Sequence, residues 1–211
     1  MSKGQGISDM ASINILHLYV RAWRLLLLVT LGGLVIAILV SVLQPLKFSS
    51  TVRLLITQTN ATGVDPYTAI KSTERIGQNL TEIAYTSSFF NAVTKQEGID
   101  TAYFSTDEID KRKEWQKTVA INVVPGTGVM DVVVYHKDRN QATLLAVAVA
   151  KELATQAPNY FGYSVRLQII DDPLPSRFFA QPDFVQNGAL GAIFGFLVGS
   201  LWVLAKMKEI R

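Results

Sequence analysis

Two long stretches of the chain contain only uncharged, mostly apolar residues, and they lie near its two ends. The first is residues 25–43 (LLLLVTLGGLVIAILVSVL) and the second is residues 188–205 (GALGAIFGFLVGSLWVLA). At about 1.5 Å per helical residue, the first stretch spans about 28 Å, close to the ~30 Å hydrocarbon core of a bilayer. The pattern predicts two transmembrane helices rather than two buried helices of a soluble core.

Basic residues flank both stretches on the sides nearer the chain ends. Arg21 and Arg24 precede the first stretch, and Lys206, Lys208 and Arg211 follow the second. Because positively charged flanks tend to stay in the cytoplasm, we expect residues 1–24 and 206–211 to be cytoplasmic and residues 44–187 to be extracytoplasmic. The first stretch is too long for a signal peptide and no small-residue cleavage site follows it, so we expect an uncleaved anchor. Residues 7–23 have the spacing of an amphipathic helix at the membrane surface, or of an extension of the first span.

The segment between the two stretches alternates between the period of strands and the period of helices. Ser105 with Glu108, and Asp138 with Gln141, have the spacing of capping boxes at helix starts. The order β-ααα-β-β-α-β predicts an α+β domain with a mixed sheet and helices. The expected strands are 47–58, 119–124, 129–135 and 165–170, and the expected helices are 67–85, 87–97, 105–117 and 138–157, with a loop at 59–66 and a turn at 125–128.

Composition narrows the chemistry that the chain can support. It has 211 residues, 18% of them charged, a mean hydropathy of +0.24, and no cysteine. Disulfides, thiolate metal sites and cysteine nucleophiles are therefore excluded. The two histidines, His17 and His136, are far apart, and no phosphate-binding loop or zinc-protease motif occurs. We expect no enzyme activity, no metal and no cofactor, and the net charge of +3 is too small to predict a nucleic-acid partner.

Several polar residues have two interpretations. Lys111, Arg112, Lys113 and Lys117 could contact an anionic glycan or a lipid pyrophosphate, but acidic residues are interleaved with them, as on an ordinary solvated helix face. Trp115 could be a core residue or a platform for a sugar ring. We expect His136 to be a surface residue. We expect Asp171 and Asp172, which precede a proline, to mark a turn after a strand.

Glycines recur every four residues in the second apolar stretch, at Gly191, Gly195 and Gly199. Residues four apart share a helix face, and a face of glycines lets two helix backbones approach closely in lipid. Gly32 and Gly33 offer a facing notch in the first stretch. The partner of this face could be the chain's own first span, another copy or a polymerase.

Four segments together resemble the chain-length determinant family, also called polysaccharide co-polymerases. In the family, a strand followed by an Asp leads into an alanine-rich helix, and here Asp138 and the alanines after it hold those places. A proline-rich segment precedes the second span, with Pro173, Pro175 and Pro182. The segments are ISDMASINILHLYVRAWRLLLLV, the strand at 45–58, VAINVVPGTGVMDVVVYHKDRNQATLLAVAVAKEL, and VRLQIIDDPLPSRFFAQPD before the glycine-rich last span.

The resemblance implies a homo-oligomer in the plasma (inner) membrane that sets the chain length of a surface polysaccharide such as O-antigen, capsule or exopolysaccharide. Its implied partners are further copies, membrane lipid, a polysaccharide polymerase or export machinery and, in the short type, a separate cytoplasmic tyrosine autokinase. The middle segment is shorter than in many members and the prolines are sparser. Only residues 206–211 follow the second span, so we expect no fused kinase. The alternatives are a two-span extracytoplasmic sensor or ligand-binding module, and a membrane glycan-processing enzyme.

Overall fold

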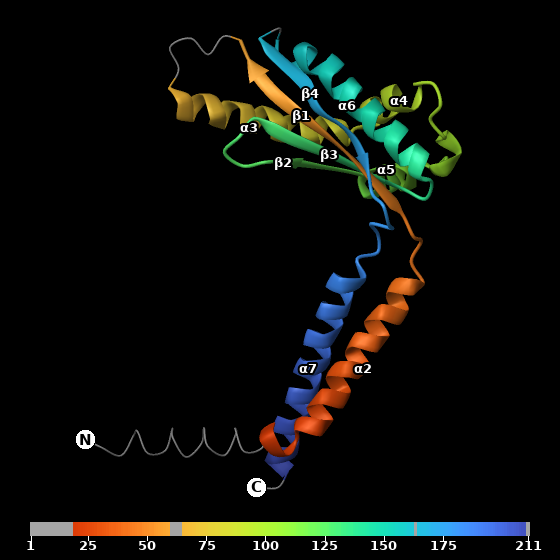
Figure 1. Ribbon diagram of the computed structural model, residues 1–211, viewed down its shortest axis with the longest axis vertical. Helices are drawn as coiled ribbons and strands as arrows, with labels where there is room; N and C mark the ends of the chain where they lie inside the picture. The colour runs from red at the N-terminus through yellow and green to blue at the C-terminus, as the bar shows by residue number, and fades with distance from the viewer. Residues whose placement is uncertain (1–18, 60–64, 163, 210–211) are drawn as a thin grey trace, which may run out of the picture. The chain divides into compact units, whose positions relative to one another are not determined.

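The computed structural model describes residues 19–59, 65–162 and 164–209, and its chain separates into two compact units (Figure 1). One unit comprises residues 46–181. The other comprises the described parts of residues 1–45 and 182–211 and holds the two long apolar helices. Most of the predicted amphipathic helix at 7–23, with His17, lies outside the described residues, as do residues 60–64 of the predicted loop.

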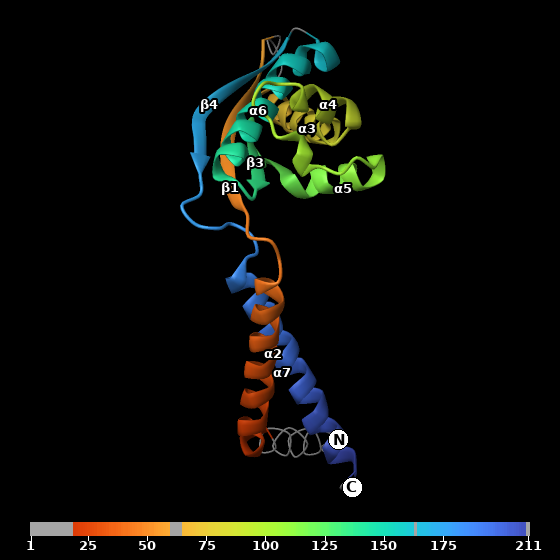
Figure 2. The ribbon, with the colours of Figure 1, turned by 90° about the vertical axis from the view of Figure 1, so that its right-hand side faces the viewer.

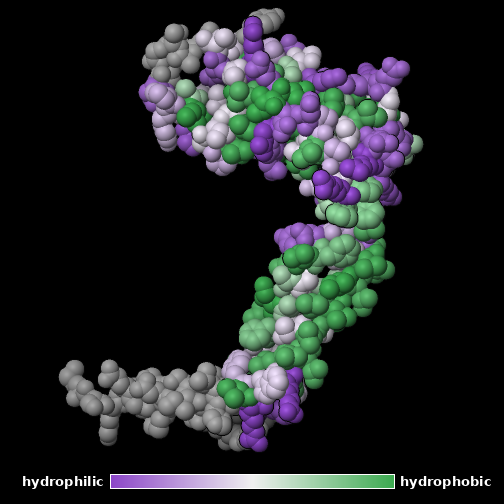
Figure 3. Space-filling view, viewed as in Figure 1, coloured by the Kyte–Doolittle hydropathy of each residue, from purple (hydrophilic) through white to green (hydrophobic). Residues whose placement is uncertain are grey.

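The helical unit is an antiparallel pair, α2 (Trp23–Val42) and α7 (Phe184–Glu209). Asp183 caps the start of α7 by accepting a hydrogen bond from the Gln186 amide at 2.9 Å. Each helix is long and apolar enough to cross a membrane. Only 11% and 22% of their apolar windows are buried, whereas a core helix of a soluble protein is buried over most of its length. In Figure 3 apolar residues cover most of the visible side of this pair.

The other unit is an α+β fold, and its order of strands and helices is the predicted one. Its sheet has four strands in the order β2-β3-β1-β4, and every pairing is antiparallel. The elements are β1 (Phe48–Gln58), α3 (Pro66–Ala84), α4 (Ser87–Thr94), the 3-10 turn η1 (Thr101–Tyr103), α5 (Glu108–Thr118), β2 (Val119–Val123), β3 (Val129–His136), α6 (Arg139–Phe161) and β4 (Val165–Pro175).

The prediction of a mixed sheet is wrong, and the connections explain why. Helix α6 links β3 to β4, a crossover that leaves these two strands running in the same direction. Strand β1 occupies the position between them and pairs antiparallel with both, from Phe48 opposite His136 on one side to Gln58 opposite Val165 on the other. The two parallel strands therefore never become neighbours.

The helices of this unit cover one face of the sheet (Figure 2). Val52, Leu54 and Ile56 of β1 point into this core, as the two-residue alternation predicted. Helix α6 packs across the strands through a buried stripe whose alanines allow close approach, including Ala142, Ala146 and Ala150. The other face of the sheet has no helix on it among the described residues.

A bidentate ion pair lies on that open face of the sheet. Arg53 of β1 and Asp131 of β3 are directly opposite each other in the register. The Arg53 guanidinium donates two hydrogen bonds to Asp131, at 2.7 and 3.0 Å. The hydrogen bond and charge of Asp131 raise the pKa of Arg53.

Strand β4 continues to Pro175, five residues beyond the predicted end. Asp171 and Asp172 therefore lie within this strand, and the prediction that they form a turn is wrong. The pairing of β4 with β1 shifts register on both sides of Arg53, so that β4 bulges where Asp171 faces Arg53. An edge strand accepts charges and prolines because one side of its backbone needs no partner.

The start of α5 also differs from the prediction. Its N-cap is Asp107, whose carboxylate accepts from the amides of Ile109 at 2.9 Å and Asp110 at 3.1 Å. Ser105 is not the cap, because its hydroxyl accepts from the amide of Asp107, which precedes the helix, at 3.2 Å. At the start of α6 the predicted cap, Asp138, accepts from the Gln141 amide at 2.9 Å.

Candidate functional site

Helices α2 and α7 pack most closely where their glycines meet. A Cβ atom on Gly33 would overlap the carbonyl oxygen of Gly191 and lie 3.0 Å from the Cα of Gly195. A Cβ atom on Gly195 would lie 2.6 Å from the carbonyl oxygen of Val29. These neighbours are backbone atoms, which cannot move aside as a side chain can. Only glycine fits at these positions without separating the helices, and close backbone packing of this kind drives helix association in lipid.

The predicted glycines differ in how tightly they are enclosed. A Cβ atom on Gly199 would lie 3.3 Å from the end of the Leu26 side chain, a contact that side-chain movement can relieve. A Cβ atom on Gly32 would have no heavy atom within 4 Å. Gly33, Gly191 and Gly195 thus form the crossing point, Gly199 lies in a looser part of the same contact, and Gly32 lies outside it.

Beside the crossing point the two helices form a groove of about 660 Å³. Both sides of the groove carry residues spaced four apart, which share a helix face. Its floor and walls are apolar apart from one end, where Gln44, Ser41 and Asn187 lie. The wall residues are Gly32, Ile36 and Val40 from α2, and Leu190, Phe194 and Val198 from α7.

A side-chain hydrogen bond joins the two helices at that polar end. The Asn187 amide donates to the Ser41 hydroxyl at 2.9 Å, and the Ser41 hydroxyl donates to the Ala37 carbonyl at 2.9 Å. The sequence pattern alone does not identify this pair. The signal in the sequence is that Ser41 is a polar residue in an apolar stretch. Polar side chains in such helices often form hydrogen bonds to a neighbouring helix.

At the opposite end of the pair each helix places a cation over a tryptophan. The Arg24 guanidinium lies 5.7 Å from the centroid of the Trp23 ring. The Lys206 amine lies 4.7 Å from the centroid of the Trp202 ring. Because the helices are antiparallel, these two pairs mark the same end of the helical unit. Tryptophan and basic residues are typical of the boundary between membrane and water.

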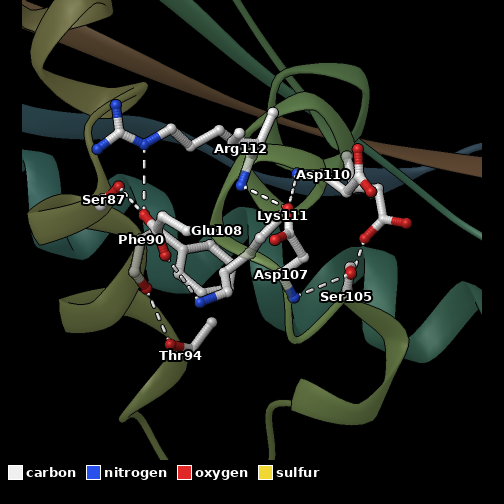
Figure 4. A network of polar contacts seen from close by, with 11 residues as sticks. Ser87, Phe90, Thr94, Ser105, Asp107, Glu108, Asp110, Lys111 and Arg112 are labelled. Atoms are coloured by element: carbon white, nitrogen blue, oxygen red, sulfur yellow. Dashed lines mark hydrogen bonds and ion pairs between the residues drawn. The ribbon is translucent and has the colours of Figure 1, made fainter.

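Three of the four cations that could contact an anionic ligand are already paired with carboxylates. Figure 4 shows two of them, Lys111 and Arg112, beside Glu108. The Lys111 amine lies 3.0 Å from Glu108 and the Arg112 guanidinium lies 3.3 Å from it. The Lys113 amine lies 3.3 Å from Asp110. Lys111, Arg112 and Lys113 therefore form a compensated helix face of the solvated kind.

Glu108 is the centre of this network. Its carboxylate accepts a hydrogen bond from the Ser87 hydroxyl, which ties the start of α5 to the start of α4. This bond, together with those from Lys111 and Arg112, lowers the pKa of Glu108 to about 2. The Lys111 amine also lies 5.8 Å from the centroid of the Phe90 ring. The network thus joins two helices rather than leaving cations open for a ligand.

Lys117, the fourth predicted cation, has different surroundings. It lies in the last turn of α5, and its charge acts on Lys47, as does that of Lys137. Partial burial, then the charges of Lys117 and Lys137, lower the pKa of Lys47, while the Glu114 carboxylate opposes this shift. Lys47 and Lys137 were not singled out from the sequence, because only the register of β1 against β3 brings them together.

Two aromatic residues that the sequence left undecided or placed on the surface are buried. Trp115 is 1% exposed, and its indole donates to the Ala84 carbonyl at 2.8 Å, so it is a core residue rather than a sugar platform. His136 is 3% exposed, and the prediction of a surface imidazole is wrong. Its Nδ1 accepts from the Asp138 amide at 3.0 Å, and burial lowers its pKa.

The prolines predicted to precede the second span do not form one segment. Pro173 and Pro175 lie in β4, where Pro175 faces Ser50 of β1. Pro182 belongs to the helical unit and stands next to the cap of α7. Between them, residues 176–181 connect the sheet to the helix.

Among the residues that the structure describes, no group of three or more histidine and acidic residues could hold a metal ion. Comparison with known proteins gave no match to any family model. It gave no match to any curated protein either.

Proposed function

We propose that this protein is a non-catalytic membrane scaffold that forms a homo-oligomer and regulates the chain length, polymerisation or export of a surface polysaccharide. In this proposal α2 and α7 span the plasma membrane, both termini are cytoplasmic, and the α+β unit is extracytoplasmic. A polysaccharide polymerase or export apparatus is the partner within the membrane. A separate tyrosine autokinase is a possible partner on the cytoplasmic side.

One observation carries the proposal. Helices α2 and α7 pack against each other through glycines, and a single α+β unit is formed by the segment of chain between them. The close contact between Gly33 and Gly195 packs α2 and α7 against each other, which supports one paired anchor rather than two independent ones. The apolar groove beside the crossing point leaves a shaped surface that a helix of a neighbouring protein can fill. A helix pair of this kind suits a scaffold that holds other membrane proteins in place.

The sheet supplies a second surface for assembly. Its open face carries the Arg53–Asp131 pair, and the Asp131 carboxylate accepts both of its hydrogen bonds from within the same sheet. A second copy can cover this face without providing a counter-charge. The sequence resemblance to polysaccharide co-polymerases adds the expected cargo, a growing glycan chain.

Deletion of the gene tests this function directly, with the size profile of the surface polysaccharide as the readout. We expect polymer to be made but to lose its preferred length, and wild-type protein supplied in trans to restore it. Gly195→Leu should fail to restore it and should weaken the oligomer, whereas Val35→Leu, at an exposed position of α2 that does not line the groove, should restore length. An unchanged profile in the deletion strain would refute the proposal.

The proposed orientation has its own test, because the chain contains no cysteine. A single introduced cysteine at Asn122, which is exposed in β2, should react with a membrane-impermeant maleimide in intact protoplasts. A single cysteine at Lys206 should react only after the membrane is opened. The reverse pattern would show that the α+β unit is cytoplasmic.

A further inference from the structure

The two ends of the α+β unit where the chain enters and leaves are tied together. Lys47 donates its amide to the Gln181 carbonyl at 3.0 Å, and the Lys47 carbonyl accepts from the Ala180 amide at 2.7 Å. The Ser176 hydroxyl accepts from the Ser49 amide at 3.0 Å. We call Lys47, Phe48 and residues 176–181, together with Lys117 and Lys137, the linker surface.

The linker surface gathers three lysines from separate parts of the chain: Lys47 just before β1, Lys117 in α5, and Lys137 between β3 and α6. The register ends with Phe48 opposite His136, and Lys47 and Lys137 are the next residues along the chain, close enough for the charge of Lys137 to act on Lys47. Lys117 approaches from the end of α5, close enough for its charge to lower the pKa of Lys47. Like charges held close together are destabilising unless an anion lies near them.

The nearby carboxylates Asp138 and Asp100 act on His136, and Asp138 is already engaged as the cap of α6. Among the described residues, no ion pair includes any of the three lysines. Glu114 is the carboxylate that acts on Lys47, but one of its oxygens already accepts from the Ser105 amide at 2.6 Å. The cluster therefore retains a positive charge that an external anion can balance.

An exposed aromatic residue accompanies these cations. Phe178 is 83% exposed, while its neighbour Phe179 packs on Phe48 with ring centroids 4.6 Å apart. The contact of Phe179 with Phe48 holds residues 176–181 in place, and the exposed Phe178 side chain can enter an apolar environment outside the protein. Phenylalanine next to lysine and arginine is typical of protein segments that lie in the interface of a membrane.

Chain length limits how far the linker surface can lie from the two apolar helices. Lys47 is five residues beyond Val42, where α2 ends, and an extended chain advances at most about 3.5 Å per residue, or about 18 Å in total. Gln181 is three residues before Phe184, where α7 begins, which limits that distance to about 10 Å. If the helices cross a membrane, the linker surface is therefore held close to its surface.

We propose that the linker surface binds the phosphate groups of anionic phospholipids through Lys47, Lys117 and Lys137. Phe178 enters the headgroup region beside them. The contact rests on the proposed insertion of α2 and α7 into a membrane, but not on any role in polysaccharide assembly. It fixes the α+β unit against the bilayer in a manner that depends on lipid charge.

The test uses full-length protein in nanodiscs of phosphatidylcholine alone or with phosphatidylglycerol. Ala180→Cys places the only cysteine of the chain two residues from Phe178 without removing a cation, and a fluorophore there reports contact with a quencher carried on lipid. We expect strong quenching only with phosphatidylglycerol. Changing the three lysines to glutamine should abolish this difference, since each cation near an anionic surface contributes about a fivefold change in binding.

The matched control changes Lys111, Arg112 and Lys113 to glutamine, which removes the same charge from a face already paired with Glu108 and Asp110. It should keep the response to phosphatidylglycerol. Phe178→Ser, with all lysines present, should weaken quenching in both kinds of disc. Circular dichroism establishes that each variant is folded.

Equal quenching in the two kinds of disc, or equal loss in the control variant, would overturn the inference. So would binding of inorganic phosphate that depends on the three lysines together with equal quenching in the two kinds of disc, because the site would then be one for free phosphate. Failure of the protein to enter either disc would instead refute the insertion of the helices. A strain that carries the variant with all three lysines changed to glutamine separates the two proposals. A normal polysaccharide profile in that strain would leave this inference intact, since the lipid contact is measured in the nanodiscs.

Discussion

Replacement of Gly33 by alanine, with Gly32→Ala as its matched control, tests the packing of the helix pair. Both substitutions add one methyl group to the same helix at adjacent positions. At Gly33 the methyl group would overlap the Gly191 carbonyl oxygen and lie 3.0 and 3.2 Å from backbone atoms of Gly195, whereas at Gly32 it meets no atom within 4 Å. The two variants thus differ in the contact with α7 and in little else.

The expected magnitude follows from the distance by which the helices must separate. Relieving an overlap with backbone atoms requires α2 and α7 to move apart by about 1 Å, and a gap of 0.5–1 Å forfeits about a quarter to a half of each affected dispersion contact. Overpacking of this kind typically costs about 1–3 kcal/mol. Alanine favours a helix over glycine by about 1 kcal/mol in both variants, so this gain cancels in the comparison. We expect a difference of about 2 kcal/mol, which is about 30-fold in the equilibrium between packed and separated helices.

Distances between two spin labels measure that equilibrium. Leu43 and Val185 are exposed residues of the helical unit, and cysteines at both positions would be the only ones in the chain. The wild type and Gly32→Ala should give the same narrow distance distribution in a bilayer, while Gly33→Ala should give a broader and longer one. Identical distributions for the two alanine variants would refute the reasoning that the Gly33 backbone contact holds the helices together.

Three further predictions concern the α+β unit. Burial lowers the pKa of His136, so below about pH 6.5 the unfolded chain binds more protons than the folded chain. The melting temperature should therefore be highest above that pH and should decline below it. His136→Gln should flatten this decline, and an unchanged decline would contradict the assignment to His136. Trp115→Phe should lower the free energy of unfolding by about 2–4 kcal/mol, as measured by chemical denaturation followed by circular dichroism. The reason is that the Ala84 carbonyl loses its hydrogen-bond donor and a cavity forms beside it. A decrease below about 0.5 kcal/mol would contradict the place of Trp115 in the core. Asp107→Ala should cost about 1 kcal/mol in the same assay and Ser105→Ala less, whereas the reverse order would restore Ser105 as the cap.

Local sequence patterns predicted most of the helices and strands because the features that define them involve residues close together in the sequence. The apolar stretches, the cap at Asp138 and the hairpin around residues 125–128 depend on neighbours within a few residues. The full length of β4 does not, because its second half pairs with β1, more than 100 residues away in the sequence. Asp171-Asp172-Pro173 has the composition of a turn, and only this pairing overrides it.

The candidate residues also divide into those whose surroundings follow from local sequence and those whose surroundings depend on a distant segment. The burial of His136 was available from the sequence, since Met130, Val132, Val134 and His136 alternate along one face of a strand. The roles of Gly32 and Gly33 could not be separated, because both lie in one helix and only the partner helix decides which of them faces it. Likewise the convergence of Lys47 with Lys137 follows from strand register, and register is a property of two segments together.

The bulged, charged end of β4 limits how copies of this protein can meet. A membrane confines its proteins at high local concentration, where an open sheet edge invites strand-to-strand growth without a defined end. Strand β4 carries two adjacent carboxylates and two prolines along that edge, so copies of like charge repel and two positions lack an amide hydrogen. Edge-to-edge growth along β4 is thereby blocked. Strand-to-strand pairing of copies is then left to β2, the other edge of the sheet, and a pair joined at that one edge cannot grow further through β4.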